Sequence, residues 1–279
     1  MPDAMLRELL ERVVAIAQDA AAEIEHLRPG LDATSGGVNR KADNSLVTKA
    51  DIAASRLIRE RLAELTPQLP VLCEEGDIPE FTQRSGWQRY WLIDPLDGTR
   101  SFVEGDDSYT VNIALIEGHR PVIGVVAVPA CGDCYFAMAG LGAFLQRSGD
   151  TVEIVSRRAQ HQLADAGRLR LVTGFRGASA VQTLMQNLAA RGVPCEHSQL
   201  GSSLKLCLLA SGGADFYPCL VRTHEWDTAA GQCVLEQAGG AVLDEHFKSL
   251  GYNQKAELAN PNFYAIADAS FDWPRKLEA

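Results

Sequence analysis

Acidic side chains recur at four places along the chain, each after an apolar run or at the start of a helix-like segment. They are Asp51, Glu74 with Glu75, Asp94 with Asp97, and Asp227. Loops at such positions converge on one edge of a sheet, so we expect the carboxylates to lie together. Converging carboxylate oxygens suit a hard divalent cation such as Mg²⁺, which keeps its other positions for water and a substrate phosphate. The pattern therefore predicts a metal site for phosphate chemistry.

The densest part of this set is segment 91–99, which reads WLIDPLDGT. Its apolar run predicts a strand that delivers Asp94 at its end. The proline that follows stiffens the exit, and a turn is expected to bring Asp97 back beside Asp94. Gly98 permits close approach of the backbone to an anion, and Thr99 supplies a hydroxyl next to it.

Each acidic position also has an explanation that needs no metal. Asp51 fits a helix-capping pattern with Thr48, Glu74-Glu75 fits a solvated turn, Asp97-Gly98 fits a turn dipeptide, and Asp227 fits a helix cap. Taken singly, these structural explanations are favoured at most of the positions. The coincidence of all four, with the dense 91–99 segment among them, favours a metal site.

Composition restricts the classes of partner. The chain has 279 residues, 46% of them hydrophobic and 22% charged, and no stretch approaches 18 consecutive apolar residues. We therefore expect neither a transmembrane segment nor a signal peptide. The excess of 36 acidic over 26 basic residues gives a formal charge of −10, which opposes binding to a polyanion and predicts no nucleic-acid partner. A phosphate substrate must be attracted locally, by bound cations, backbone N–H groups or a few Lys and Arg side chains.

Seven cysteines are scattered through mostly apolar segments, and this odd number favours a reducing cytoplasm over a disulfide framework. Cys131 and Cys134 form the one close pair. Their spacing allows a redox or zinc role, but Gly-Asp between two β-like runs favours a tight turn.

Apolar spacing predicts an amphipathic helix over residues 3–27, ended by Pro29-Gly30. The polar stretch 34–44 fits a hairpin, and the capping pattern at Thr48 opens a second helix that runs to Leu65. From residue 69 onward, short β-rich runs separated by Gly, Pro and Asp predict a large sheet. These runs cover residues 69–73, 90–93, 110–116, 122–128 and 134–137.

The second half alternates strand-like and helical segments. The strand-like segments are 169–173, 214–217, 241–243 and 263–267, and the helical ones are 178–191, 202–211 and 227–238. No linker or low-complexity tract separates the halves. We predict an N-terminal α+β half, residues 1–150, that carries most of the metal ligands, joined in one compact unit to a C-terminal α/β half, residues 151–279.

Three motifs occur in order over most of the chain: Glu74-Glu75, Asp94-Pro-Leu-Asp97-Gly-Thr99 and Trp226-Asp227-Thr-Ala-Ala-Gly231. Jointly they resemble the inositol-monophosphatase-like superfamily of lithium-sensitive, Mg²⁺-dependent phosphatases. Within it, segments 110–115, 121–126 and 201–207 are most similar to the bacterial CysQ type, the 3′(2′),5′-bisphosphate nucleotidases. The resemblance implies an α/β (α+β) fold, a layered α-β-α-β-α sandwich, which agrees with the helix pair, large sheet and α/β half predicted above.

The resemblance also implies roles for individual residues. It assigns two or three Mg²⁺ ions to Glu74, Asp94, the carbonyl of Leu96, Asp97 and Asp227. It makes Asp51 and Thr99 the pair that orients and activates the attacking water. Gly98 and Thr99 would hold the phosphate, while the turn Gly201-Ser202-Ser203, together with Asp227, would meet the sugar.

The chain departs from the family's patterns near the last metal ligand. Leu220 stands seven residues before Asp227, where the inositol phosphatases usually carry Glu, which counts against an inositol substrate. Cys219 follows Tyr-Pro where the nucleotidases often carry Arg, so we expect Arg222 or Lys205 to replace that charge at the second phosphate. Arg-Ser-Phe at 100–102 replaces the usual Lys-Glu-Phe.

The favoured function is hydrolysis of the 3′-phosphate of adenosine 3′,5′-bisphosphate, or of its sulfated relative, to the 5′-nucleotide and phosphate, which would link the protein to sulfur assimilation. One alternative is a phosphatase of the same superfamily for another sugar or polyol phosphate, such as inositol 1-phosphate. Another is a catalytically silent regulator that binds metal or nucleotide. Retention of Asp51 and Thr99 with every metal ligand argues against the silent regulator. The sequence leaves the oligomeric state open, a homodimer included.

Overall fold

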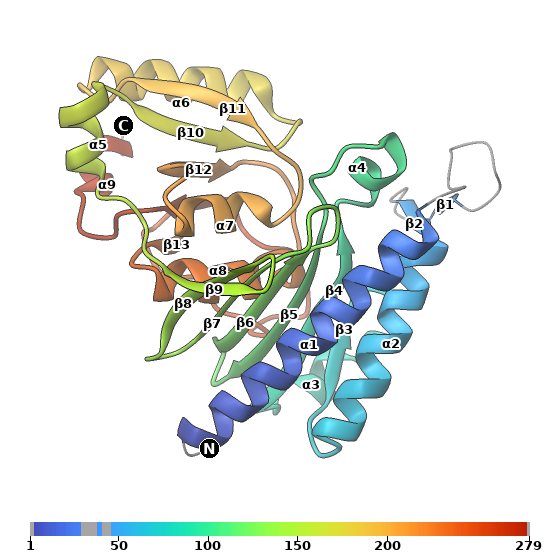
Figure 1. Cartoon of the computed structure of the whole chain (residues 1–279). Coiled ribbons are helices and arrows are strands. Elements are labelled where there is room, and N and C mark those ends of the chain that lie inside the picture. The colour runs from blue at the N-terminus through green and yellow to red at the C-terminus, as the bar shows by residue number, and fades with distance from the viewer. Residues whose placement is uncertain (1–2, 29–37, 41–45, 278–279) are drawn as a thin grey trace.

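Helices and sheets alternate in five layers in the computed structural model, which describes residues 3–28, 38–40 and 46–277 (Figure 1). A pair of helices covers one face of a seven-stranded sheet, two helices lie between that sheet and a five-stranded sheet, and further helices cover the outer face of the latter. The predicted α-β-α-β-α sandwich is confirmed. Within the described part of the chain, no helix is long and apolar enough to cross a membrane.

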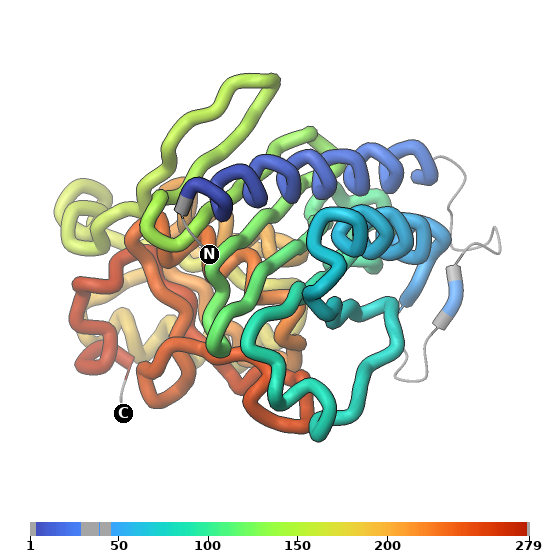
Figure 2. The backbone as a smooth tube through the Cα atoms, turned by 90° about the horizontal axis from the view of Figure 1, so that it is seen from below, coloured from blue at the N-terminus to red at the C-terminus, as the bar shows by residue number. Residues whose placement is uncertain are grey.

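The first layer is the helix pair α1 (Asp3–Leu27) and α2 (Lys49–Leu65), which lie side by side in both views (Figures 1 and 2). Val13, Ala17 and Ile24 of α1 recur at helical spacing and are completely buried. Pro29-Gly30 lies outside the described residues. So does most of the predicted hairpin 34–44, of which β1 (Val38–Arg40) pairs antiparallel with β2 (Leu46–Thr48).

The seven-stranded sheet has its strands in the order of the sequence, from β3 to β9. Its strands are β3 (Val71–Cys73), β4 (Arg89–Asp97), β5 (Thr110–Glu117), β6 (Arg120–Val128), β7 (Asp133–Met138), β8 (Gly142–Arg147) and β9 (Asp150–Ile154). Only the β3–β4 pair is parallel. The Cys131–Cys134 segment lies at the β6–β7 hairpin, as predicted, and all seven cysteines are free thiols.

Strand β4 continues past the predicted end at Asp94. It runs to Asp97, and its pairing with β5 shifts register between Asp94, opposite Asn112, and Asp97, opposite Thr110. The predicted turn is therefore wrong, and a bulge takes its place. Pro95 explains the difference, because a residue without a backbone N–H is tolerated in a sheet at a bulge.

The middle layer consists of α7 (Leu204–Ala210) and α8 (Glu225–Gln237). Apolar side chains on all sides of both helices are buried against the two sheets in one core, which includes Leu206, Leu209 and Val234. This shared core joins the two halves of the chain. The division near residue 150 stays a prediction. Strand β9, which begins at Asp150, still belongs to the first sheet.

The five-stranded sheet has the order β11-β10-β12-β14-β13. Its strands are β10 (Leu169–Thr173), β11 (Cys195–Gln199), β12 (Phe216–Cys219), β13 (Ala241–Asp244) and β14 (Phe263–Ile266). Three helices, α5 (Ala159–Ala166), α6 (Ala178–Ala190) and α9 (Trp273–Leu277), cover its outer face around a third core. Two short helices, α3 (Phe81–Arg84) and α4 (Thr99–Glu104), complete the fold.

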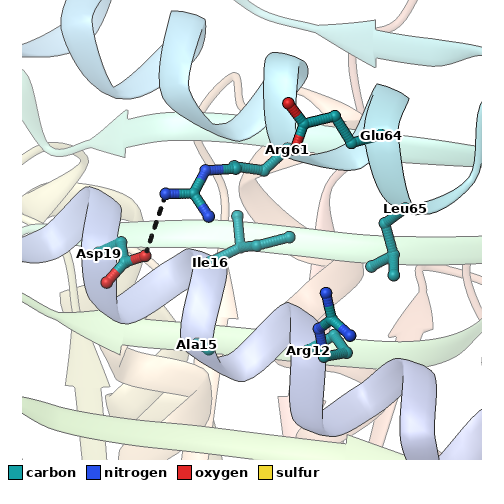
Figure 3. Close-up of a pocket in the computed structure, with 7 residues that line it drawn as sticks. All are labelled: Arg12, Ala15, Ile16, Asp19, Arg61, Glu64 and Leu65. Carbon is teal, nitrogen blue, oxygen red and sulfur yellow. Dashed lines mark ion pairs between the residues drawn. The ribbon is translucent and has the colours of Figure 1, made fainter.

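A pocket of 220 Å³ opens between α1 and α2 (Figure 3). Arg61 of α2 reaches toward Asp19 of α1, with the two charged groups 4.0 Å apart, while Arg12 lies nearby on α1. The side chains of Arg12, Asp19 and Arg61 are exposed, so water screens their charges. This pocket contains none of the predicted site residues.

Candidate metal centre and active site

Three carboxylates meet where β3 and β4 end and α8 begins. Glu74 follows β3, Asp94 lies in β4, and Asp227 lies in the first turn of α8. One carboxylate oxygen from each lies within 4.8 Å of the others. Asp94 is 1% exposed, and the other two side chains are half-buried. The structure thus brings together three of the predicted ligands, of which Glu74 and Asp227 are more than 150 residues apart in the sequence.

The remaining predicted ligands, Leu96 and Asp97, lie in the bulge of β4, and Asp97 is not one of the three carboxylates grouped within 4.8 Å. Asp97 accepts a hydrogen bond from the backbone N–H of Ser203, with Oδ2 and N 2.5 Å apart. The Leu96 N–H donates to Asp94 Oδ1 at 3.0 Å, and the Leu96 carbonyl oxygen lies 3.3 Å from Thr99 Oγ1. The Asp94 carboxylate is therefore held from within its own segment, and the Asp97 carboxylate is held from the turn before α7.

Electrostatics make the cluster a suitable site for a cation. Burial, and after it repulsion from neighbouring carboxylates, raises the pKa of Asp94 and of Asp227 well above the ordinary value. Burial raises the pKa of Asp97 to about 6, although Lys205 and the Ser203 N–H act in the opposite direction. Packed oxygen ligands with excess negative charge fit Mg²⁺, which prefers carboxylate and carbonyl oxygens. Glu74, Asp94, Asp97 and Asp227 would hold it.

Asp51 lies at the start of α2 and contacts two segments. Its Oδ2 accepts hydrogen bonds from the Thr48 N–H at 2.7 Å and the Thr48 hydroxyl at 2.6 Å, and Thr48 Oγ1 accepts in return from the Ala50 N–H. The predicted capping box is therefore present. Its Oδ1 accepts from Thr99 Oγ1 at 3.0 Å. Asp51 is thus both a helix cap and the partner of Thr99.

The loop after β4 is closely packed against the turn before α7. Gly98 has φ +91°, a conformation that L side chains rarely adopt, and a Cβ there would lie 3.0 Å from the Ser108 carbonyl and 3.3 Å from the Ser202 Cβ. A Cβ on Gly201 would lie 2.4 Å from Ser108 Oγ. Ser202 itself has φ +49°. The two glycines therefore allow the predicted phosphate segment and the predicted sugar turn to touch.

The two candidate cations for a second phosphate differ in their surroundings. Arg222 is exposed in the loop between β12 and α8, and Cys219 is buried at the end of β12. Lys205 is 5% exposed, and its ammonium group donates to the carbonyls of Leu200 at 3.2 Å and Ser202 at 2.5 Å. Of these two, Arg222 is therefore the one already open to solvent.

Two polar residues of β5 lie at the site although neither was predicted to be a site residue. Asn112 Oδ1 accepts from Ser203 Oγ at 2.7 Å, and Thr110 Oγ1 lies 2.8 Å from the same hydroxyl. Both residues are fully buried, and they pair across the bulge with Asp94 and Asp97. The sequence contained one signal for them, because polar residues two apart on one strand share a face.

Comparison with known proteins agrees with this fold and arrangement. The chain belongs to the inositol monophosphatase family, whose sequence model matches residues 5–271, so the predicted resemblance is confirmed. It is 37% identical to the 3′(2′),5′-bisphosphate nucleotidase CysQ of Aggregatibacter actinomycetemcomitans over 96% of each chain. It is 40% identical to the protein of that name from Salmonella typhimurium, over 91% of this chain and 98% of that one. The solved structure of CysQ from Bacteroides thetaiotaomicron is 32% identical, has a TM-score of 0.75, and is matched over 94% of this chain and 98% of its own.

Proposed function

We propose that this chain is a Mg²⁺-dependent 3′(2′),5′-bisphosphate nucleotidase. Its favoured reaction is hydrolysis of the 3′-phosphate of adenosine 3′,5′-bisphosphate, or of the sulfated relative, to the 5′-nucleotide and inorganic phosphate. The observation that carries the proposal is the cluster of Glu74, Asp94 and Asp227, with the hydrogen-bonded pair Asp51 and Thr99 beside Leu96. Relatives named as bisphosphate nucleotidases, 37% to 40% identical over nearly the whole chain, support the choice of substrate.

The site residues have different roles in the in-line attack of water on the phosphate. Two or three Mg²⁺ ions, when bound to the cluster, would supply Lewis acidity toward the phosphate and the attacking water. Thr99 Oγ1 gives its hydrogen to Asp51 Oδ1, so its lone pairs face away from that bond and can accept a hydrogen from the water. Asp51 is held by three hydrogen bonds and is placed to accept the proton.

Substrate contacts are assigned to the closely packed pair of loops. Gly98 and Thr99 hold the phosphate, since Gly98 lies at the N-cap of α4 and Thr99 is its first residue. The turn Gly201-Ser202-Ser203, with Asp227, meets the sugar. Arg222 is assigned to the second phosphate, because an exposed guanidinium can swing onto it without leaving a buried partner unpaired.

We place the protein in the cytoplasm as part of the same proposal. Seven free thiols suit a reducing cytoplasm, and the substrate is a small phosphate ester. A homodimer is compatible with the proposal, because none of the assigned residues needs a second subunit.

The test is a comparison of kcat/KM on a panel with and without Mg²⁺. The panel contains adenosine 3′,5′-bisphosphate, adenosine 5′-monophosphate, inositol 1-phosphate and fructose 1,6-bisphosphate. We expect the 3′,5′-bisphosphate to be preferred by at least about tenfold, loss of activity in EDTA, recovery with Mg²⁺ and inhibition by lithium. Preference for inositol 1-phosphate would replace the nucleotidase by a polyol phosphatase. Release of no phosphate from any compound would favour the silent regulator.

A further inference from the structure

Lys205 is a buried cation whose hydrogen bonds end on backbone carbonyls. It lies in the first turn of α7, in the layer between the two sheets (Figure 1). Its ammonium group donates to the carbonyls of Leu200 and Ser202 and lies 5.0 Å from the ring centroid of Tyr217. A lysine is rarely buried to this extent unless neighbouring negative charge compensates the loss of hydration. Two carbonyl oxygens and an aromatic face compensate only part of that loss.

The negative charge that compensates the rest of this loss comes from two carboxylates of the candidate site, Asp97 and Asp227. Asp97 and Asp227 both favour the charged form of Lys205, against the burial that lowers its pKa, and Lys205 in turn favours the ionised forms of both carboxylates. The attraction acts through space, because the two hydrogen bonds of the ammonium go to carbonyls. In a poorly hydrated interior such attraction remains substantial beyond contact distance.

The turn 200–203, whose carbonyls accept hydrogen bonds from Lys205, also donates a hydrogen bond to the Asp97 carboxylate. Ser203 directly follows Ser202, whose carbonyl accepts from Lys205, and it donates its N–H to Asp97 and its hydroxyl to Asn112. The positive φ of Ser202 is unfavourable for a residue with a side chain, so this turn needs support from its surroundings. The Lys205 hydrogen bond to the Ser202 carbonyl provides it.

We infer that Lys205 is a built-in counter-cation of the carboxylate cluster. Its fixed charge and its two bonds to the 200–203 turn keep Asp97 and Asp227 in place while no metal is bound. The same positive charge repels an incoming divalent ion. Lys205 therefore lowers the affinity for Mg²⁺ while it keeps the metal-free site in its binding geometry. Lys205 is thus a positioning residue rather than a contact of the substrate. The inference rests on the proposed function only in that Mg²⁺ is the ion bound.

Two neutral variants and one control test this role, all in the absence of nucleotide. Lys205→Met keeps an apolar stem of similar length, and Lys205→Gln keeps a donor for the turn carbonyls. Lys248→Met removes an exposed lysine beyond β13 and serves as the matched control. The measurements are urea unfolding of the metal-free protein in EDTA and Mg²⁺ binding by calorimetry.

Removal of the positive charge should have opposite effects on the two readouts. Metal-free Lys205→Met should unfold at a lower urea concentration than the wild type, because the carboxylates repel one another with less compensation. Its Mg²⁺ affinity should rise on the order of tenfold, so saturating Mg²⁺ should recover most of the lost stability. Lys205→Gln should show the same tighter binding with a smaller loss of stability. Lys248→Met should leave both readouts unchanged.

Several results would overturn the inference. Unchanged or weaker Mg²⁺ binding in Lys205→Gln would show that the charge does not oppose the metal. Normal stability and normal Mg²⁺ affinity, with only KM raised in a later assay, would return Lys205 to the substrate contact predicted from sequence. Should Lys205→Met fail to fold in EDTA, Lys205→Gln decides the matter. Because no nucleotide is present, a wrong substrate assignment would leave these results as they are.

Discussion

Thr99 donates its hydroxyl hydrogen to Asp51 across a distance of 3.0 Å, joining the start of α4 to the start of α2. The other oxygen of Asp51 is occupied by the N–H and hydroxyl of Thr48. Capping of α2 uses only the bonds from Thr48, so the bond from Thr99 is not explained by a capping role alone. The Asp51 carboxylate therefore makes a structural contact with Thr48 and a proposed catalytic contact with Thr99. Substitutions can separate the two.

Asp51→Asn should lower kcat by about 10²- to 10⁴-fold, the usual range for general-base assistance. An amide of the same shape cannot take up a proton, and its NH₂ group would face donors at either Thr48 or Thr99. Stability should therefore fall too, by about 1 kcal/mol. Phosphate release and the urea midpoint measure the two effects.

Thr48→Ala is the control for this variant. It removes the side-chain half of the capping box but leaves the Asp51 carboxylate and its bond from Thr99. We expect a similar loss of about 1 kcal/mol with a much smaller change in kcat. If both variants keep near-normal kcat, Asp51 is a cap and has no part in the reaction.

The metal-free protein should become less stable as the pH rises. Folding raises the pKa of Asp97 from 3.8 to about 6, so the folded state binds more protons than the unfolded state between these values. Stability from this group is therefore present in acid and lost as the pH rises through about 6, by about 1 to 3 kcal/mol. Asp94 and Asp227, raised further, extend the loss to higher pH.

Saturating Mg²⁺ should reverse this dependence, because the ion binds ionised carboxylates and competes with protons. Thermal midpoints at pH 5 and 8, in EDTA and in Mg²⁺, check both signs. Asp97→Asn should flatten the slope in EDTA. A metal-free protein more stable at pH 8 than at pH 5 would show that burial and mutual repulsion do not raise the pKa values of these carboxylates as described.

Much of this architecture was predictable where local patterns are strong. The buried apolar face of α1, the cap at Thr48 and the apolar strands β4 to β7 all appear near their predicted positions. Strand β11, in contrast, is the polar sequence CEHSQ at the edge of its sheet, and it is a strand because its backbone pairs with β10. Strands β8 and β9 were missed as well. Backbone pairing leaves no apolar signature in a polar segment such as β11. Strand β8 does carry one, since Ala143 and Leu145 are buried in the core.

In the site, too, some features follow from local sequence patterns and others depend on how the strands pair. Motif spacing placed Glu74 just after its strand and Asp227 in the first turn of its helix, because the apolar run before the one and the helical pattern after the other mark these ends. Asp94, in contrast, lies inside β4 and not at its predicted end. The bulge at Pro95 was missed, since the choice between a turn and a bulge depends on how β5 pairs with β4. The burial of Lys205 was missed for a similar reason. It depends on the second sheet, which contributes Tyr217.

Arg222→Ala should raise KM for adenosine 3′,5′-bisphosphate by more than it raises KM for a substrate with one phosphate. A charge-assisted phosphate contact is worth about 1.5 to 3 kcal/mol, and an exposed arginine gives the lower part of this range, about tenfold. Arg12→Ala is the control, because Arg12 lies in the pocket between α1 and α2 and outside the site (Figure 3). Equal effects of Arg222→Ala on both substrates would place Arg222 outside the binding site.

Gly98→Ala tests the contact between the phosphate segment and the sugar turn, and the chain offers a close control. Gly98 and Gly105 both have positive φ, +91° and +81°, and they lie at the two ends of α4. A Cβ on Gly105 meets no atom within 4 Å, whereas one on Gly98 meets the Ser108 carbonyl at 3.0 Å and Ser202 at 3.3 Å. Gly105→Ala should therefore cost about 1 kcal/mol of backbone strain and leave kcat and KM unchanged.

Gly98→Ala should carry that strain and also force the two loops apart. We expect a loss of stability larger than that of Gly105→Ala, together with a fall in kcat/KM of at least about 10²-fold, because small displacements of positioned groups are costly in catalysis. Urea unfolding and phosphate release on both variants make the comparison. Equal stability losses with normal turnover in Gly98→Ala would mean that the loops tolerate separation, and that the phosphate is held elsewhere.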